Sequence, residues 1–201
     1  MATMAHPQHH PNDVVKSFFP MNYGGMKSSP SGYDRTNLNS YNHEVVNAIR
    51  SSNVTYLREL LYSTNSTSEQ QTFEACNHNS EYLIHLACRR ANLETIQFLV
   101  LEAGVNVHVR DGLGRTVLHD ACWRPRYEPA ILEFLMQVLD PMFLLMTDDR
   151  GHSAFDYIRK ENWSQLTGFL ETQRDLVRQR IRSSRLWERY CQAAARHAAT
   201  N

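Results

Sequence analysis

The sequence lacks most of the features that define several large classes of protein. Its 201 residues contain only four cysteines, too few for a disulfide scaffold. Lysine plus arginine and aspartate plus glutamate number 21 each, which argues against a wholesale nucleic-acid coat. The longest apolar run, Met142 to Met146, has five residues, whereas a membrane span needs about 18. No signal peptide is recognisable in the first thirty residues. We therefore expect reduced thiols in a protein of the cytoplasm, the nucleus or both.

The first forty residues differ in composition from the rest of the chain. They hold four of the seven prolines, three of the eight glycines and no sustained apolar period. A segment of this kind buries too little apolar surface to offset its chain entropy, so a disordered N-terminal arm is predicted for residues 1–40. Its one apolar cluster, Phe18-Phe19-Pro20-Met21, is either a short docking motif or, as we favour, a sticky spot in a tail.

From residue 41 onward the apolar residues form pairs of short helical segments that recur along the chain. His85 and His119 lie 34 residues apart, and the matching Asp156 follows 37 residues later. Fixed spacing with two short helices in each unit indicates a solenoid. The apolar segments of the four units are Val45–Ile49 with Tyr56–Leu61, Leu83–Cys88 with Ile96–Val100, Val117–Cys122 with Ile131–Leu135, and Ala154–Ile158 with Leu166–Leu170.

The third unit carries the most specific motif, which reads Asp111-Gly112-Leu113-Gly114-Arg115-Thr116-Val117-Leu118-His119-Asp120-Ala121-Cys122. This stretch resembles the ankyrin repeat, whose pattern has an aspartate and a glycine before Thr-Pro-Leu-His-x-Ala-Ala. The resemblance covers roughly residues 41–171. It implies an all-α solenoid of about four helix-turn-helix units, with small residues where helices approach closely and His119 bridging neighbouring units.

The last thirty residues have helical apolar spacing, and residues 171–201 carry a net charge of +4, whereas residues 41–170 carry −5. We predict a basic amphipathic helix over residues 172–201, which caps the open end of the stack. Six arginines are expected on its outer side. They form either a solvated face, which we favour, or a contact for nucleic acid or a membrane surface. They are Arg174, Arg178, Arg180, Arg182, Arg185 and Arg189.

Two patterns could carry chemistry. The His85-x-x-Cys88 and His119-x-x-Cys122 pairs have the residue types of a zinc site. Both pairs fall on repeat positions where a buried cysteine acts as a small hydrophobe, so no metal is predicted. His152 and Asp156 lie four residues apart, but no third catalytic group accompanies them. We predict no cofactor and no catalytic residue, and hence a protein that is not an enzyme.

The resemblance implies a non-catalytic protein-binding module: a scaffold, an adaptor or a regulatory subunit. In ankyrin-like domains the variable positions lie at the hairpin tips and in the last turn of each first helix, and together they line the concave face. Trp123 flanked by arginines predicts an acidic partner with an apolar anchor. The alternative is a nucleic-acid-linked regulator that uses the arginine-rich C-terminal helix. The positions on the concave face are Arg89, Arg90, Trp123, Arg124, Lys160 and Glu161 on the helices, and Leu113, Arg115 and Arg150 at the tips.

Overall fold

The computed structural model describes residues 9–20, 42–63 and 73–199 of the chain. Apart from the short N-terminal helix α1 (Pro11–Lys16), the helices come in pairs along the sequence. None of the helices in these residues has the length and apolar character needed to cross a lipid bilayer. The paired elements are α2 (His43–Arg50) with α3 (Val54–Ser63), α4 (Leu83–Arg90) with α5 (Leu93–Gln97) and its continuation η2 (Phe98–Glu102), α6 (Val117–Cys122) with α7 (Pro129–Val138), and η4 (Ala154–Tyr157) with α8 (Trp163–Ser183). The short turn η3 (Pro141–Leu144) lies between the third and fourth pairs, η5 (Lys160–Asn162) lies between η4 and α8, and α9 (Arg185–Ala199) follows α8.

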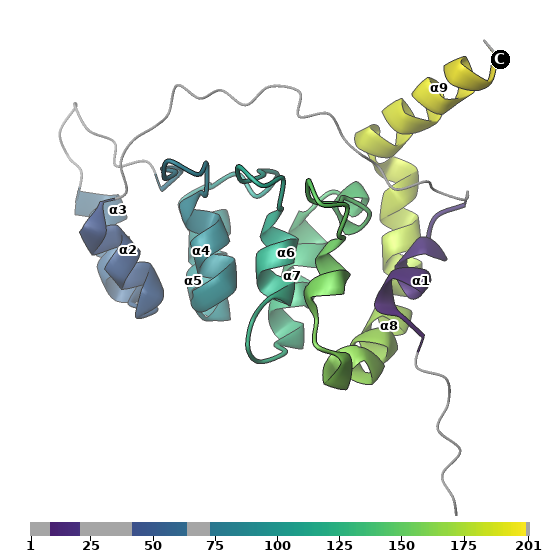
Figure 1. Cartoon of the computed structure of the whole chain (residues 1–201). Coiled ribbons are helices and arrows are strands. Elements are labelled where there is room, and N and C mark those ends of the chain that lie inside the picture. Colours follow the sequence, from purple (N-terminus) through teal and green to yellow (C-terminus); the bar gives the residue numbers. More distant parts are fainter. Residues whose placement is uncertain (1–8, 21–41, 64–72, 200–201) are drawn as a thin grey trace, which may run out of the picture.

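The four pairs stand side by side and form an all-α solenoid, as the sequence predicted (Figure 1). The first helices α2, α4, α6 and η4 make one layer, in which each contacts the next. The second helices α3, α5, α7 and α8 make the layer behind. In the fourth pair the first helix is reduced to the single 3-10 turn η4.

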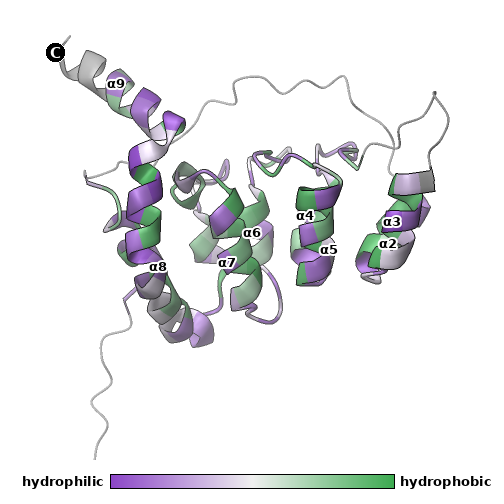
Figure 2. Ribbon diagram, turned by 180° about the vertical axis from the view of Figure 1, so that it is seen from behind, coloured by the Kyte–Doolittle hydropathy of each residue, from purple (hydrophilic) through white to green (hydrophobic). Residues whose placement is uncertain are grey.

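Small and apolar side chains hold the layers together. Ala87 and Cys88 on α4 and Leu118 on α6 are completely inaccessible to solvent, so the two helices pack closely. Burial of such side chains is the main source of stability in a repeat stack, because each unit leaves an apolar face that only its neighbour can cover. Figure 2 shows hydrophobic and hydrophilic residues alternating around the helices of the stack.

A tight hairpin precedes the first helix of units two, three and four. It is closed by an antiparallel bridge in each case: Cys76 with Tyr82, Arg110 with Thr116 and Thr147 with Ser153. Successive hairpin tips are also linked, because the Gly112 N–H donates to the Asn79 carbonyl at 2.7 Å. A Cβ atom at Gly112 would lie 2.5 Å from that oxygen. Gly114 has φ of +75°, a conformation that glycine adopts at no steric cost.

The N-terminal segment corrects one prediction. Residues 1–40 were expected to be a disordered arm, but residues 9–20 form α1 and the turn after it, which pack against η4 and α8. Val14, Val15, Phe18 and Phe19 are all buried there. The helix starts at Pro11, which suits a first helical position, and Lys16 is exposed near its end. Docking covers the apolar side chains that a free tail would leave in water. The rest of the predicted arm, residues 1–8 and 21–40, lies outside the described residues.

The C-terminal part of the chain corrects a second boundary. One helix was predicted over residues 172–201, but α8 already begins at Trp163 and a second helix, α9, begins at Arg185. The break occurs at Ser184, which is buried and has extended backbone. Its hydroxyl lies 2.7 Å from an Asp140 carboxylate oxygen and accepts the Trp187 N–H at 3.0 Å. Ser184 therefore ends α8 and caps α9, a role that the apolar spacing does not reveal.

Candidate interaction surface

Two buried histidines join neighbouring units. The His85 ring contacts the Arg115 carbonyl through Nε2 at 3.3 Å, and the His119 Nε2 contacts the His152 carbonyl at 3.1 Å. In both rings Nδ1 accepts a backbone N–H, from Tyr82 in the first case and Thr116 in the second. Nε2 therefore carries the proton and donates it to the carbonyl. The bridging role predicted for His119 matches this geometry.

Burial keeps both rings neutral. It lowers the pKa of His85 to about 4, although the nearby Asp111 carboxylate acts in the opposite direction. Burial also lowers the pKa of His119 from its ordinary value. A neutral imidazole with one donor and one acceptor fits a site that offers one N–H and one carbonyl. These histidines are therefore structural links between units rather than acid–base groups.

Trp123 lies at the end of α6, with half of its surface exposed. The guanidinium carbon of Arg115 lies 5.5 Å from the centre of the Trp123 ring, and that of Arg89 lies 6.0 Å from it. The Tyr157 ring is 6.0 Å away on the following unit. Three consecutive units thus contribute to one aromatic and basic cluster, in which Trp123 is the exposed member and which we call the Trp123 cluster: Arg89, Arg115, Trp123 and Tyr157.

Buried carboxylates hold the two arginines of this cluster. The Arg89 Nε lies 3.1 Å from an Asp120 carboxylate oxygen, and the same guanidinium also pairs with Glu81. Arg115 pairs with Asp111 at 2.7 Å and 2.5 Å. Asp120 is fully inaccessible, and this burial raises its pKa to about 7 even though both arginines favour the charged form. The arginine side chains are therefore fixed against the Trp123 ring before any partner arrives.

Arg124 was predicted on the same surface, but the structure places it inside the stack. Only 9% of its side chain is exposed. Its guanidinium donates to the Cys88 and Ala91 carbonyls at 2.9 Å each and also pairs with Glu128. These carbonyls end the first helix of the preceding unit, so Arg124 caps that helix and does not face a partner.

The remaining predicted positions do not join the Trp123 cluster. Arg90 is exposed at the end of α4. Leu113, which is half exposed, and Arg150 lie at hairpin tips. Lys160 is exposed near α8, with its ammonium 5.9 Å from the centre of the Trp163 ring, and Glu161 beside it pairs with Arg159.

Sequence reasoning missed two residues near this surface. Tyr157 reaches Trp123 from η4 and donates its hydroxyl hydrogen to Asp148 at 2.5 Å. Arg50 ends α2 as Arg90 ends α4, and both residues line one cavity between these two helices. Arg50 could have been predicted from the sequence, because it is the last residue of the first helix in its unit. The family positions had been transferred only from units two to four.

The patterns considered for chemistry are separated in space or closed to solvent. Burial raises the pKa of the Cys88 and Cys122 thiols far above the ordinary value. Among the described residues there is no group of three or more His, Cys, Asp or Glu side chains that could hold a metal ion. His152 faces Asp148 at 3.8 Å. Asp156 instead binds the N–H and the hydroxyl of Ser153.

Half of the arginines predicted on the outer side of the C-terminal helix have roles within the fold. Arg174 lies over the Phe18 ring, Arg178 donates to the Ser17 carbonyl, and Arg180 donates to the Met136 and Leu139 carbonyls. They therefore attach α1 and α7 to α8. The other three, Arg182, Arg185 and Arg189, have exposed side chains.

Residues 84–135 match the family described as ankyrin repeats (many copies), and they cover units two and three of the stack. Over these residues the chain is similar to ankyrin repeats, which is the resemblance that the motif of the third unit indicated. A search of the curated proteins found no match. Ankyrin repeats are generally protein–protein interaction modules, and proteins built from them are typically not catalysts.

Proposed function

We propose that this protein binds a partner protein on its concave face, as a scaffold, an adaptor or a regulatory subunit. The Trp123 cluster is the observation that supports this most strongly. A half-exposed tryptophan lies beside two arginines here, and tryptophan and arginine are the residue types enriched at binding hot spots. Its place at the end of a first helix is where ankyrin-like domains vary.

The chemistry of the cluster defines the partner that we propose. Trp123 offers a flat apolar surface of which 50% is exposed, and the guanidinium groups of Arg89 and Arg115, each paired with a carboxylate, lie beside its ring. We therefore expect an acidic surface that carries one apolar anchor, with the anchor packed on Trp123. Because Arg89 and Arg115 are already ordered by carboxylates, binding costs little of their side-chain entropy.

The test is substitution of Trp123 in the full chain, with a partner captured from native extract and identified by mass spectrometry. Trp123→Ala should weaken binding by about 2 kcal/mol or more, measured by calorimetry. Leu101→Ala is the control, because Leu101 is another exposed large apolar residue and lies on η2, in the second layer. Unchanged affinity of Trp123→Ala would overturn the proposal.

The binding measurement also tests the alternative, in which the arginine-rich C-terminal helix binds nucleic acid. Arg182→Glu with Arg189→Glu removes positive charge that has no role in the described fold. If these changes abolish binding to the captured partner, or reduce a steep salt dependence of nucleic-acid binding, the C-terminal helix is the functional surface. We expect them to leave partner affinity unchanged.

We also propose that the protein acts in the cytoplasm or the nucleus. The support is the small number of cysteines, of which Cys88 and Cys122 are buried as thiols in the described structure. Microscopy of a fluorescent fusion expressed in its own host would test this. A secreted or luminal fusion would contradict it.

A further inference from the structure

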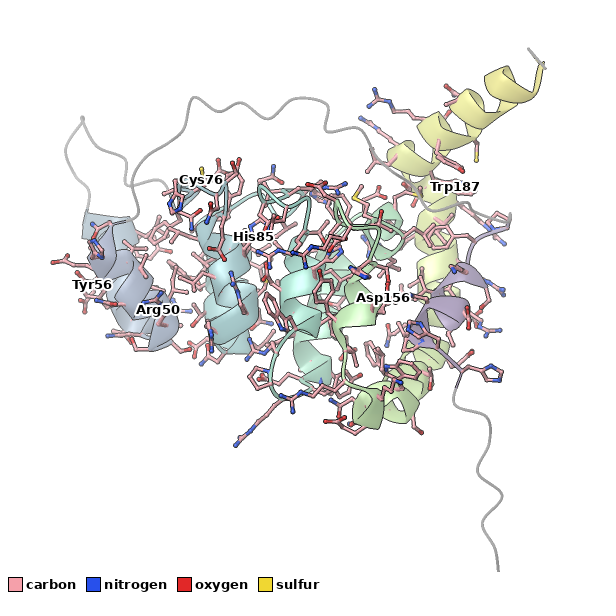
Figure 3. All side chains as sticks on the ribbon, viewed as in Figure 1. Arg50, Tyr56, Cys76, His85, Asp156 and Trp187 are labelled. Carbon is pink, nitrogen blue, oxygen red and sulfur yellow. The ribbon has the colours of Figure 1, made fainter. Side chains whose placement is uncertain are left out.

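A cavity of about 470 Å³ opens between the first helices of units one and two. It is lined by Arg50 at the end of α2, by Leu86, Arg89 and Arg90 on α4, and by Glu81 before α4. Figure 3 labels Arg50 at the end of α2 that lies away from the hairpin tips. Arg89 belongs to this cavity and to the Trp123 cluster at the same time, so the two are adjacent.

The cavity has an excess of positive charge. Its lining contains three arginines and one glutamate, a formal charge of +2. Arg89 is balanced by Glu81 and Asp120. Within the described residues Arg50 and Arg90 are exposed and have no ion pair, whereas Arg58, on the neighbouring α3, pairs with Glu102 at 2.7 Å.

The position at a helix end explains why Arg50 and Arg90 are arginines, but not why the two lie beside the same cavity. An arginine in the last turn of a helix is favoured by the negative end of the helix dipole, and this applies to Arg50 and Arg90 separately. The helix dipole does not supply an anion for the two guanidinium groups beside this cavity. Such groups bind carboxylates with good geometry, because the planar fork of donors matches two oxygens. Leu86 is buried at the same cavity and offers an apolar contact to the methylene stem of an acidic side chain.

A lining with two exposed arginines is matched best by two adjacent carboxylates, and the sequence of residues 21–41 and 64–72 contains no adjacent pair of acidic residues. Residues 21–41 contain one acidic side chain, Asp34, and residues 64–72 contain one, Glu69. One carboxylate leaves a charge of +2 incompletely matched. Charge complementarity therefore points to a different chain with neighbouring acidic residues.

We propose that this cavity binds two adjacent carboxylates of an acidic peptide segment in the partner protein, with one paired to Arg50 and one to Arg90. The inference rests on the proposed function, because the same segment continues past Arg89 to Trp123. Stacked helices lie about 8–10 Å apart, and an extended chain advances about 3.3–3.6 Å per residue. The apolar anchor then follows the acidic pair after two or three residues.

Three fluorescein-labelled peptides test the proposal against the full chain by fluorescence polarisation. They share the sequence Gly-Ser-x-x-Ser-Gly-Phe-Leu-Ser, in which the two variable positions are Glu-Glu, Gln-Gln or phosphoserine-Gln. We expect the Glu-Glu peptide to bind at least ten-fold more tightly than the Gln-Gln peptide. Arg50→Ala with Arg90→Ala should remove this preference. The matched control, Arg126→Ala with Arg182→Ala, removes the same charge from two exposed arginines elsewhere and should keep the preference.

The Trp123→Ala variant separates this inference from the proposed function. It should weaken the Glu-Glu and Gln-Gln peptides by a similar factor and leave their ratio unchanged. If the affinity ratio of the Glu-Glu and Gln-Gln peptides is unchanged in the Arg50→Ala with Arg90→Ala variant, while Trp123→Ala still weakens both peptides, the cavity assignment alone is overturned. A ratio that depends on the arginines, with no effect of Trp123→Ala, would support the cavity and overturn the Trp123 anchor. No saturable binding of the Glu-Glu peptide, or tighter binding of the phosphoserine peptide, would overturn the assignment of two carboxylates.

Discussion

The inner interfaces of the stack and its C-terminal end perform the same task with different residues. Between units two and three His85 reaches the carbonyl of Arg115, and between units three and four His119 reaches the carbonyl of His152. At the C-terminal end Asp156 takes the corresponding position. Its carboxylate accepts the Asn12 side-chain N–H at 2.8 Å and lies 3.3 Å from the His10 ring. The element beyond Asp156 is α1, from the other end of the sequence.

This difference shows how a short stack closes its open face. A further unit would present a first helix to η4 and α8, and α1 occupies that face with four buried apolar side chains (Figure 1). The inner interfaces are built from repeated residues, so each resembles the next. The end is built from a segment without repeat character, fixed by Asp156, Arg174 and Arg178. We therefore expect the inner interfaces to tolerate less change than the end.

The largest effect is expected from a charge placed within an inner interface. Ala87 is completely buried between α4 and its neighbours, and Ala87→Arg would bury an unpaired guanidinium there. We expect a loss of about 4 kcal/mol or more in the free energy of unfolding, enough to unfold a marginally stable domain. Thermal unfolding followed by circular dichroism measures this. Ala130→Arg on the exposed side of α7 is the control and should change stability by about 0.5 kcal/mol or less.

The second effect tests the end of the stack. Phe18 is buried under the Arg174 guanidinium, and Phe18→Ala would remove most of its apolar contact with α8. Truncation of a buried phenylalanine costs about 3 kcal/mol or more. Urea unfolding of the full chain should show this loss, whereas Lys16→Ala, an exposed change on the same helix, should show almost none. Equal stability of the Phe18→Ala variant and the parent would show that the α1 segment does not contribute to the stability of the fold.

The repeat could be predicted from the sequence because its signal is periodic. The spacing of 34 and 37 residues between His85, His119 and Asp156 located the units and the inter-unit links. The docking of α1 could not be predicted from the mean composition of forty residues, because only a short stretch of that segment is apolar. Val14, Val15, Phe18 and Phe19 do have helical spacing, but nothing in a single sequence says which distant surface they would cover.

The candidate site was predicted in part for a similar reason. Family position alone placed Trp123 and Arg124 on one surface, but only one of the two side chains is exposed there. Trp123 remains half exposed, whereas Arg124 turns back to cap the preceding helix. The direction of a long side chain depends on which carbonyls lack a donor nearby, and that depends on packing between units. Arg50 was missed because its unit has the weakest family motif.

A third prediction uses pH to weaken one inner interface selectively. The pKa of His85 is about 4 in the fold and 6.5 as its ordinary value, so the unfolded chain takes up a proton first as the pH falls. The stability that His85 contributes is complete above pH 6.5 and is lost as the pH falls towards 4. Between pH 7 and pH 5 the loss amounts to about 2 kcal/mol. Asp120, with its raised pKa, has the opposite effect over part of this range.

Comparison with a variant isolates the histidine. The pH dependence of urea unfolding is measured for the parent and for His85→Gln, which retains a donor and an acceptor but does not titrate. Because both chains contain Asp120, its contribution cancels in the difference. The parent should lose about 2 kcal/mol more than the variant between pH 7 and pH 5. Parallel pH profiles would show that the His85 ring is already protonated in the fold or is not buried.

The smallest effect distinguishes arginines that hold the end of the stack from arginines that do not. Arg180 on α8 donates to the carbonyls of Met136 and Leu139, the latter at 2.7 Å, and so attaches the end of α7 to α8. Arg180→Ala leaves these carbonyls without their charged donor, for which we expect a loss of about 1 kcal/mol. Arg182→Ala removes the same charge two residues later from an exposed position, and should change stability by less than about 0.5 kcal/mol. Because the net charge changes equally in both variants, a difference in their urea midpoints reports the hydrogen bonds alone. Equal midpoints would mean that α8 is held to the stack by its apolar side chains, and that the arginines on its surface are available for other contacts.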